Sequence, residues 1–150
     1  MTGLDPAAER ALAVELFNHA WALLDKEDRT EADQEQVIHC AHASAWHWSR
    51  VGTSENRAVS EWQVSRVYST VGRAEPAVHH ARLCLAFAET VPDAAWVRAS
   101  AYEGLARAYA VAGQSKIALD WRERAVAALE GIDDPQERAV VEQDIATLPL

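Results

Sequence analysis

The sequence predicts an all-α protein: a short right-handed α-solenoid of three antiparallel helical hairpins and a C-terminal capping helix, about seven helices in a single domain over residues 1–150. One indication is an Arg-Ala pair that recurs along the chain. The last three pairs stand 41 and 40 residues apart (57 to 98 to 138), and the first stands 47 residues before the second (10 to 57). A repeat of this length is typical of stacked helical hairpins.

A second indication is the set of residues that follow the first three arginines at fixed distances. Large side chains stand seven residues on (Phe17, Val64, Leu105) and eleven residues on (Trp21, Tyr68, Tyr109), and a turn residue stands fifteen residues on (Asp25, Gly72, Gly113). There is no strand-like alternation of apolar and polar residues. The register therefore extends through the first helix of each unit and into the turn that ends it.

The first hairpin is expected between Asp5 and Val51. Asp5 is a favourable N-cap and Pro6 suits a first helical turn, so the first helix should run from Pro6 to about Lys26. A charged loop follows and carries the six extra residues of the first period (47 against 41). Thr30 then caps the second helix, which should run to about Val51.

The second and third hairpins each begin with a helix that a glycine ends. We expect helices over about 55–71 and 95–112, followed by tight turns at Gly72 and Gly113. Pro76 lies in the first turn of the fourth helix, where a proline is tolerated. Short turns of this kind make consecutive helices antiparallel neighbours.

The end of the chain should hold the sixth and seventh helices. Ser115 is expected to cap the sixth helix and Gly131 to end it. Asp134-Pro135 opens the last helix, which Pro149 must stop. We expect this helix to cover the open end of the solenoid with one apolar face, formed by Val140, Val141 and Ile145.

Composition excludes several classes of function. The net charge of −9 makes nucleic acids and anionic membrane surfaces poor partners, and no apolar run is long enough to span a membrane. The N-terminus shows no signal-peptide pattern. Cys40 and Cys84 lie in helical patterns and are expected to be buried thiols in a reducing compartment, which favours the cytoplasm.

Two units carry a family resemblance. The segment 101–109, followed by Gly113 and Ala118, resembles the tetratricopeptide repeat, and so do Val64, Ser65, Tyr68, Gly72, Ala77 and Ala81 in the unit before it. The period is longer than the usual 34 residues of that family, and Asp25 replaces the turn glycine of the first unit. The segments 42–48 and 61–68 further resemble a group of small bacterial proteins of this fold. The resemblance implies the fold and no particular activity.

In tetratricopeptide domains the first helix of each hairpin lines the concave face, and this gives candidate binding residues. Five residues after each arginine stand Glu15, Trp62 and Glu103, and nine residues after stand His19, Arg66 and Arg107. Arg66 and Arg107 could hold a carboxylate or phosphate beside an exposed Trp62. Alternatively, Glu103 pairs internally with either arginine. The carboxylate clamp of the family uses Lys and Asn, where this chain has Glu15 and His19.

Other residues suggest chemistry less specifically. His39, His42 and His80, with Glu35, could form a zinc site or simply be solvated or packed histidines. His47 could be a packed core histidine or reach the end of the pocket. We expect Trp62 to be exposed and the other tryptophans to fill the core: Trp21, Trp46, Trp48, Trp96 and Trp121.

The sequence contains no phosphate-binding loop, zinc-protease motif, nucleophile elbow or Cys-x-x-Cys motif. We therefore expect a non-enzymatic module, without cofactor or metal, that binds a peptide or protein segment. One alternative is a small-anion or metal pocket, or an unfamiliar enzyme, that uses His19, His42, Arg66 and Glu103. Another is a structural role in which the ends of the solenoid pair two copies of the chain.

Overall fold

The computed structural model describes residues 3–150 and is helical throughout this range apart from its turns and ends. One short 3-10 turn, η1, separates the last two helices. The elements are α1 (Pro6–Leu24), α2 (Glu31–Val51), α3 (Ser54–Thr70), α4 (Ala74–Ala88), α5 (Ala95–Val111), α6 (Ser115–Ala128), η1 (Leu129–Gly131) and α7 (Pro135–Ala146).

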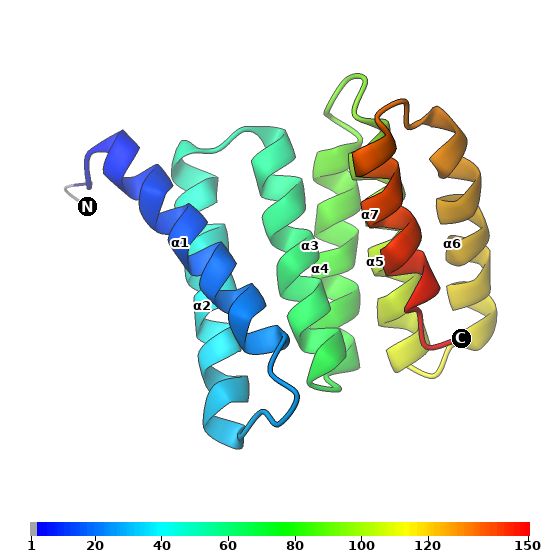
Figure 1. Cartoon of the computed structure of the whole chain (residues 1–150), viewed down its shortest axis with the longest axis horizontal. Coiled ribbons are helices and arrows are strands. Elements are labelled where there is room, and N and C mark those ends of the chain that lie inside the picture. Colours follow the sequence, from blue (N-terminus) through cyan, green and yellow to red (C-terminus); the bar gives the residue numbers. More distant parts are fainter. Residues whose placement is uncertain (1–2) are drawn as a thin grey trace.

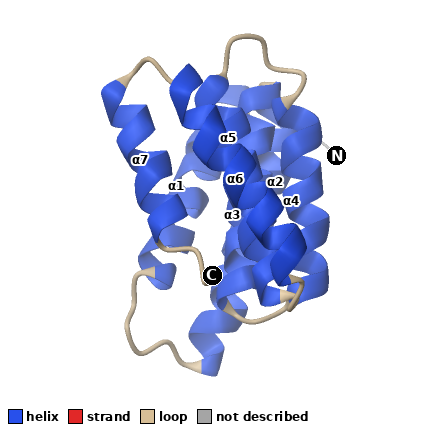
Figure 2. Cartoon of the chain, turned by 90° about the vertical axis from the view of Figure 1, so that its right-hand side faces the viewer, coloured by secondary structure: helices blue, strands red, loops and turns tan. Residues whose placement is uncertain are grey.

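The helices form three antiparallel hairpins and a single last helix, as the repeat predicts (Figure 1). The hairpins are α1–α2, α3–α4 and α5–α6, and each packs on the next along the chain. Viewed from the end of the stack, α7 lies to one side, α2 and α4 lie to the other, and α3, α5 and α6 overlap between them (Figure 2). The fold is therefore the short α-solenoid expected from the sequence. None of the helices in the described range is long and apolar enough to cross a membrane.

The helix starts and stops follow local chemistry. The Asp5 carboxylate accepts from the Ala8 backbone N–H at 3.3 Å, and Thr30 forms a capping box with Asp33. Gly72 and Gly113 have φ of +78° and +75°, a region that favours glycine because it lacks a Cβ atom. The predicted caps at Asp5 and Thr30 and the predicted turns at both glycines are therefore confirmed.

The hairpins close through small residues and pack on each other through large ones. The hydroxyl of Ser65 on α3 donates to the carbonyl of Ala77 on α4 at 2.8 Å, so the two backbones lie close together. Ala118 plays the equivalent small-residue part in the next hairpin and is fully buried. Val64 and Leu105, seven residues after their arginines, are also buried between neighbouring elements.

Three expectations about single residues were wrong. Ser115 is the first residue of α6, and Gln114 stands at the N-cap without a side-chain hydrogen bond. Val140 is 62% exposed. The buried stripe of α7 is formed by Val141 and Ile145, which are four residues apart, and Val140, next to Val141 in the sequence, lies on a different face of the helix. Trp46 is 53% exposed, on the surface of α2, whereas Trp48 is buried.

The open end is also covered differently from the expectation. The last helix α7 packs mainly on α5 and makes smaller contacts with α6. Leu119 and Val126 on α6 remain exposed. Thus α7 continues the row of first helices of the hairpins, as its own Arg-Ala pair at 138–139 suggests, instead of lying flat over α6.

A buried carboxylate joins α1 to α2. Glu9 is 4% exposed and its Oε1 accepts from His47 Nδ1 at 3.1 Å and from Arg50 Nε at 2.6 Å. His47 thus lies in a packed environment, as one of the two interpretations of it held. The hydrogen bond from His47 and the charge of Arg50 together keep the pKa of Glu9 below its ordinary value.

We expect this carboxylate to make the fold sensitive to acid. A lowered pKa in the folded state contributes stability above the unfolded-state pKa, near 4.5, which is lost as the pH falls through the folded-state value. Glu9→Gln should therefore lower the unfolding midpoint at pH 7, and its deficit should shrink as the pH falls below 4.5 toward the folded-state pKa of Glu9. Thermal unfolding followed by circular dichroism across this range would measure the difference. Glu15→Gln, on an exposed position of α1, is the control. A Glu9→Gln deficit that does not change with pH would contradict the assignment.

Candidate functional site

The concave groove of the solenoid has two walls and a floor. The side chains that line its two cavities come mainly from α1 and α7, which form the walls, and from α3 and α5, which form the floor. The first helices of the hairpins are parallel. Residues at equivalent offsets from their arginines therefore lie at the same depth along the groove.

Two adjoining cavities in this groove are lined mainly by apolar side chains. The larger, of about 350 Å³, lies between α1 and the floor, and the smaller, of about 80 Å³, lies between the floor and α7. Val59 and Trp96 line both cavities. The larger is completed by Val14, Phe17, Trp48, Glu55 and Asn56; the smaller is completed by Ala58, Trp62, Cys84, Val97, Ser100, Val140 and Asp144. Concave apolar surfaces with a few polar groups are typical of binding sites.

An arginine between two tryptophans lies deeper along the groove. The Arg66 guanidinium stands 5.9 Å from the ring centre of Trp21 on α1 and 5.6 Å from that of Trp62 on α3. The two tryptophan rings are themselves 5.6 Å apart, at an interplanar angle of 42°. These contacts hold the arginine in place by cation–π attraction.

Below Arg66 lies a group of charged side chains, the Glu103 cluster, formed by Glu103, Arg66, Arg107 and Asp144. Glu103 is fully buried at the centre of α5, and both of its oxygens are occupied. Trp62 Nε1 donates to Oε2 at 2.9 Å and Arg107 Nε donates to Oε1 at 2.7 Å. Arg66 Nη1 is farther away, 3.6 Å from Glu103 and 3.5 Å from Asp144. The internal pairing of Glu103 is therefore present.

Arg107 ties the last helix to the cluster. Its Nη2 donates to the carbonyl of Asp144 at 2.8 Å and to the Thr147 hydroxyl at 2.9 Å, and its Nη1 donates to the Thr147 carbonyl at 3.2 Å. The last carbonyls of a helix lack an N–H donor four residues on, and the guanidinium adds to the hydrogen bonds that the Asp144 carbonyl accepts from the N–H and hydroxyl of Thr147. Arg107 thus links α5 to α7 and has a structural role, with its donors directed into the protein.

Burial sets the ionisation of the cluster. Loss of water raises the pKa of Asp144 and lowers that of Arg66, and the neighbouring opposite charges only partly offset both effects. The cluster contains two arginines and two carboxylates, so its formal charge is zero. Burial also raises the pKa of the thiols of Cys40 and Cys84, which keeps both cysteines from acting as nucleophiles at neutral pH.

The structure brings together four of the six candidate residues: Trp62, Arg66, Glu103 and Arg107. The other two make their contacts elsewhere. His19 is exposed on α1 and its Nε2 lies 3.2 Å from Gln36 on α2. His42 on α2 lies 2.8 Å from the Tyr68 hydroxyl. Trp62 is only partly exposed, because its indole faces Glu103.

The histidines of the second helices pack together instead of forming a zinc site. The His42 and His80 rings are 5.2 Å apart between their centres, and His80 Nδ1 lies 2.6 Å from a Glu61 oxygen. Desolvation lowers the pKa of His42. Within residues 3–150 no group of three or more His, Cys, Asp or Glu side chains is arranged to hold a metal, and His39 is exposed. In the described chain His42 and His80 are therefore packed histidines, and His39 is a solvated one.

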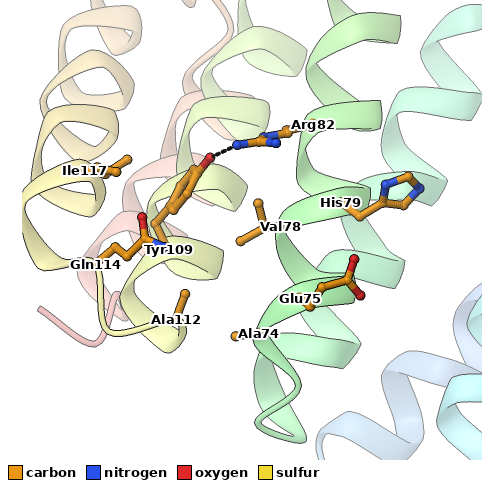
Figure 3. A pocket seen from close by; sticks show the side chains of 9 residues that line it. All are labelled: Ala74, Glu75, Val78, His79, Arg82, Tyr109, Ala112, Gln114 and Ile117. Atoms are coloured by element: carbon orange, nitrogen blue, oxygen red, sulfur yellow. Dashed lines mark hydrogen bonds between the residues drawn. The ribbon is translucent and has the colours of Figure 1, made fainter.

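A third cavity, of about 520 Å³, lies away from the groove, between α4 and α6 (Figure 3). Figure 3 shows Arg82 reaching from α4 to the hydroxyl of Tyr109, to which it donates a hydrogen bond. The contact repeats the one between His42 on α2 and Tyr68 on α3, at the preceding junction between hairpins, so it belongs to the stacking of the repeats. Because the charged side chains at its edge are exposed, this cleft is less suited to selective binding than the groove.

Helix α7 contributes two residues to the site that the repeat offsets do not include. Asp144 completes the Glu103 cluster, and Val140 lines the smaller cavity. One signal was available: the fourth Arg-Ala pair, at Arg138, marks α7 as equivalent to α1, α3 and α5, so a groove-facing side was to be expected of it.

A comparison of the chain with protein-family models, curated proteins and solved structures finds no match in any of the three.

Proposed function

We propose that this chain is a non-enzymatic binding module of the tetratricopeptide-repeat type, which holds a peptide or protein segment in the concave groove. A single observation carries the proposal: the two adjoining cavities present a continuous apolar surface, bounded by Trp48, Trp96 and Trp62, within a groove that is otherwise polar. A large aliphatic or aromatic side chain of the partner would bury itself there. Aromatic pockets of this kind dominate the energetics of many interfaces.

The rest of the groove is suited to recognition more than to catalysis. Asp144, which lines the smaller cavity, is engaged in the Glu103 cluster, and the thiol that lines the same cavity, Cys84, is inert. The free, buried thiols also agree with a reducing compartment, so we place the protein in the cytoplasm. The apolar cavities and the repeat architecture together support a binding role.

The test introduces charge into the groove without disturbing the core. Val14 on α1 and Val140 on α7 are 42% and 62% exposed and line the two cavities, so Val14→Asp and Val140→Asp should fold normally. Peptides selected on the wild type from a random library should bind each variant at least about tenfold more weakly, measured by fluorescence polarisation. Val126→Asp, at a 44% exposed position of α6, is the matched control and should bind as the wild type does.

Two outcomes would contradict the proposal. One is that the library yields no specific binder to the folded wild type. The other is that selected peptides bind Val14→Asp and Val140→Asp as tightly as the wild type, which would place their site outside the groove. A circular dichroism spectrum for each variant would confirm that its helices are retained.

A further inference from the structure

The guanidinium of Arg66 lacks a well-matched partner. Its Nη1 atom is buried without a hydrogen bond, and the nearest carboxylate oxygens of Glu103 and Asp144 stand at 3.6 and 3.5 Å. Trp21 and Trp62 lie close to it and help to remove it from water. A desolvated guanidinium prefers a close, bidentate carboxylate at 2.7–2.9 Å, roughly. The Arg66 guanidinium is therefore fixed in position but only loosely paired with a carboxylate.

Neither Glu103 nor Arg107, the two members of the cluster on α5, can improve this pairing. Both oxygens of Glu103 already accept hydrogen bonds, from Trp62 and from Arg107. Arg107 directs its own donors to Glu103 and to the end of α7. The contact of Arg66 with Asp144 is thus the one that can be exchanged.

Asp144 is at the edge of the site, on the wall helix α7. Its side chain is 17% exposed and also lines the smaller apolar cavity. Because burial raises the pKa of its carboxyl, the ionised form is held there at a disadvantage. A rotation of this side chain toward solvent would relieve the desolvation and uncover Arg66.

We propose that the partner segment presents an acidic side chain to Arg66, in the position that the Asp144 carboxylate now occupies, beside the apolar side chain that enters the tryptophan-lined cavities. This inference rests on the proposed function and names the chemistry of its partner. Asp144 then acts as an internal competitor. It keeps the arginine neutralised in the free protein, and a partner must displace it.

The local charge balance favours this exchange over a basic partner at the same point. Replacing one carboxylate by another keeps two carboxylates beside Arg66 and Arg107, whereas a cation would bring a third positive charge into the cluster. The net charge of −9 opposes an acidic partner at long range. However, salt screens such forces beyond about 8 Å at physiological ionic strength. The short-range pairing with Arg66 therefore determines that the partner group is acidic.

The experiment uses a small probe with both features. In spectra of the ¹⁵N-labelled chain, 3-phenylpropionate should shift the indole N–H signals of Trp21 and Trp62, assigned by Trp→Phe variants. Its uncharged analogue, 3-phenylpropionamide, should bind much more weakly. Asp144→Asn should bind the carboxylate about fivefold more tightly, because the competitor loses its charge while keeping its shape. Glu142→Gln, on an exposed position of α7, should behave as the wild type.

The outcomes separate this inference from the proposed function. Equal binding of acid and amide, or no gain in Asp144→Asn, would overturn the role of Arg66 while leaving the groove as a peptide site. The absence of any tryptophan shift, in the wild type and in Asp144→Asn alike, would also overturn it. The groove itself is judged separately, by the peptide binding of the Val14→Asp and Val140→Asp variants. Loss of carboxylate binding in a folded Arg66→Gln variant would complete the support.

Discussion

Replacing Glu103 by Ala should destabilise the protein by about 3–5 kcal/mol, since removing one partner of a buried ion pair leaves the other buried without compensation. Glu103 is 0% exposed and accepts hydrogen bonds from Trp62 and Arg107. Its loss would leave Arg66 and Arg107 in the interior with only Asp144 to balance their charge. Urea unfolding followed by circular dichroism would measure the free energy of unfolding directly.

The chain contains a matched control for this prediction. Glu142 and Arg138 form an ion pair with the same four-residue spacing, at 2.9 Å, on the exposed surface of α7. Glu142→Ala should change the free energy of unfolding by no more than about 0.5 kcal/mol, because water screens an exposed pair. Glu103→Gln keeps the shape of the side chain and isolates the effect of charge. Equal stability of Glu103→Gln and the wild type would show that the cluster does not depend on the carboxylate.

Replacing Arg107 by Met should loosen α7 more than any other part of the molecule. The change removes the donors to the Asp144 and Thr147 carbonyls and to the Thr147 hydroxyl, which hold the end of the helix. We expect local opening of α7 to become easier by about 3 kcal/mol, equivalent to a roughly hundredfold faster exchange of its amide hydrogens. Hydrogen exchange at Val141 and Ile145, the buried residues of α7, would report this.

The comparison within one spectrum makes this result specific. Amides of α2, which lies far along the chain and makes no contact with α7 among residues 3–150, should exchange as in the wild type. Arg138→Met removes an exposed arginine from α7 itself and should leave its exchange unchanged. An Arg107→Met variant whose α7 amides exchange at the wild-type rate would show that apolar packing alone holds the helix.

The fold could be predicted because its signals are local and repeated. The turn glycines Gly72 and Gly113 need positive φ, and the caps at Asp5 and Thr30 satisfy N–H groups within three residues. Each signal depends on neighbours in the sequence, so it can be recognised without knowing the tertiary structure. The period then fixes how the hairpins follow one another.

The binding residues could be predicted only in part. The repeat offsets placed Trp62, Arg66, Glu103 and Arg107 on one face, and the structure brings them together. The same offsets also included His19, which lies on the exposed side of α1, since α1 packs much less on α3 than α3 packs on α5. Offsets define a face of a helix but do not say which neighbour covers it.

The contact of Asp144 with Arg66 could not be predicted from the sequence, for a different reason. Its partner Arg66 is 78 residues away (144 − 66), so no local pattern joins them. Whether α7 lay over α6 or beside α5 decides which of its faces meets the groove. The fourth Arg-Ala pair favours the place beside α5, but the contact between Asp144 and Arg66 becomes visible only in three dimensions.

The arrangement of the two walls has a mechanical consequence. No backbone contact joins α1 to α7 in the described part of the chain, so the walls are connected only through α3 and α5. The distance between α1 and α7, and so the width of the groove, therefore changes with small rotations between successive hairpins. A partner that touches one wall leaves this flexibility intact. A partner that touches both stiffens the whole solenoid and loses part of its binding free energy to the lost motion.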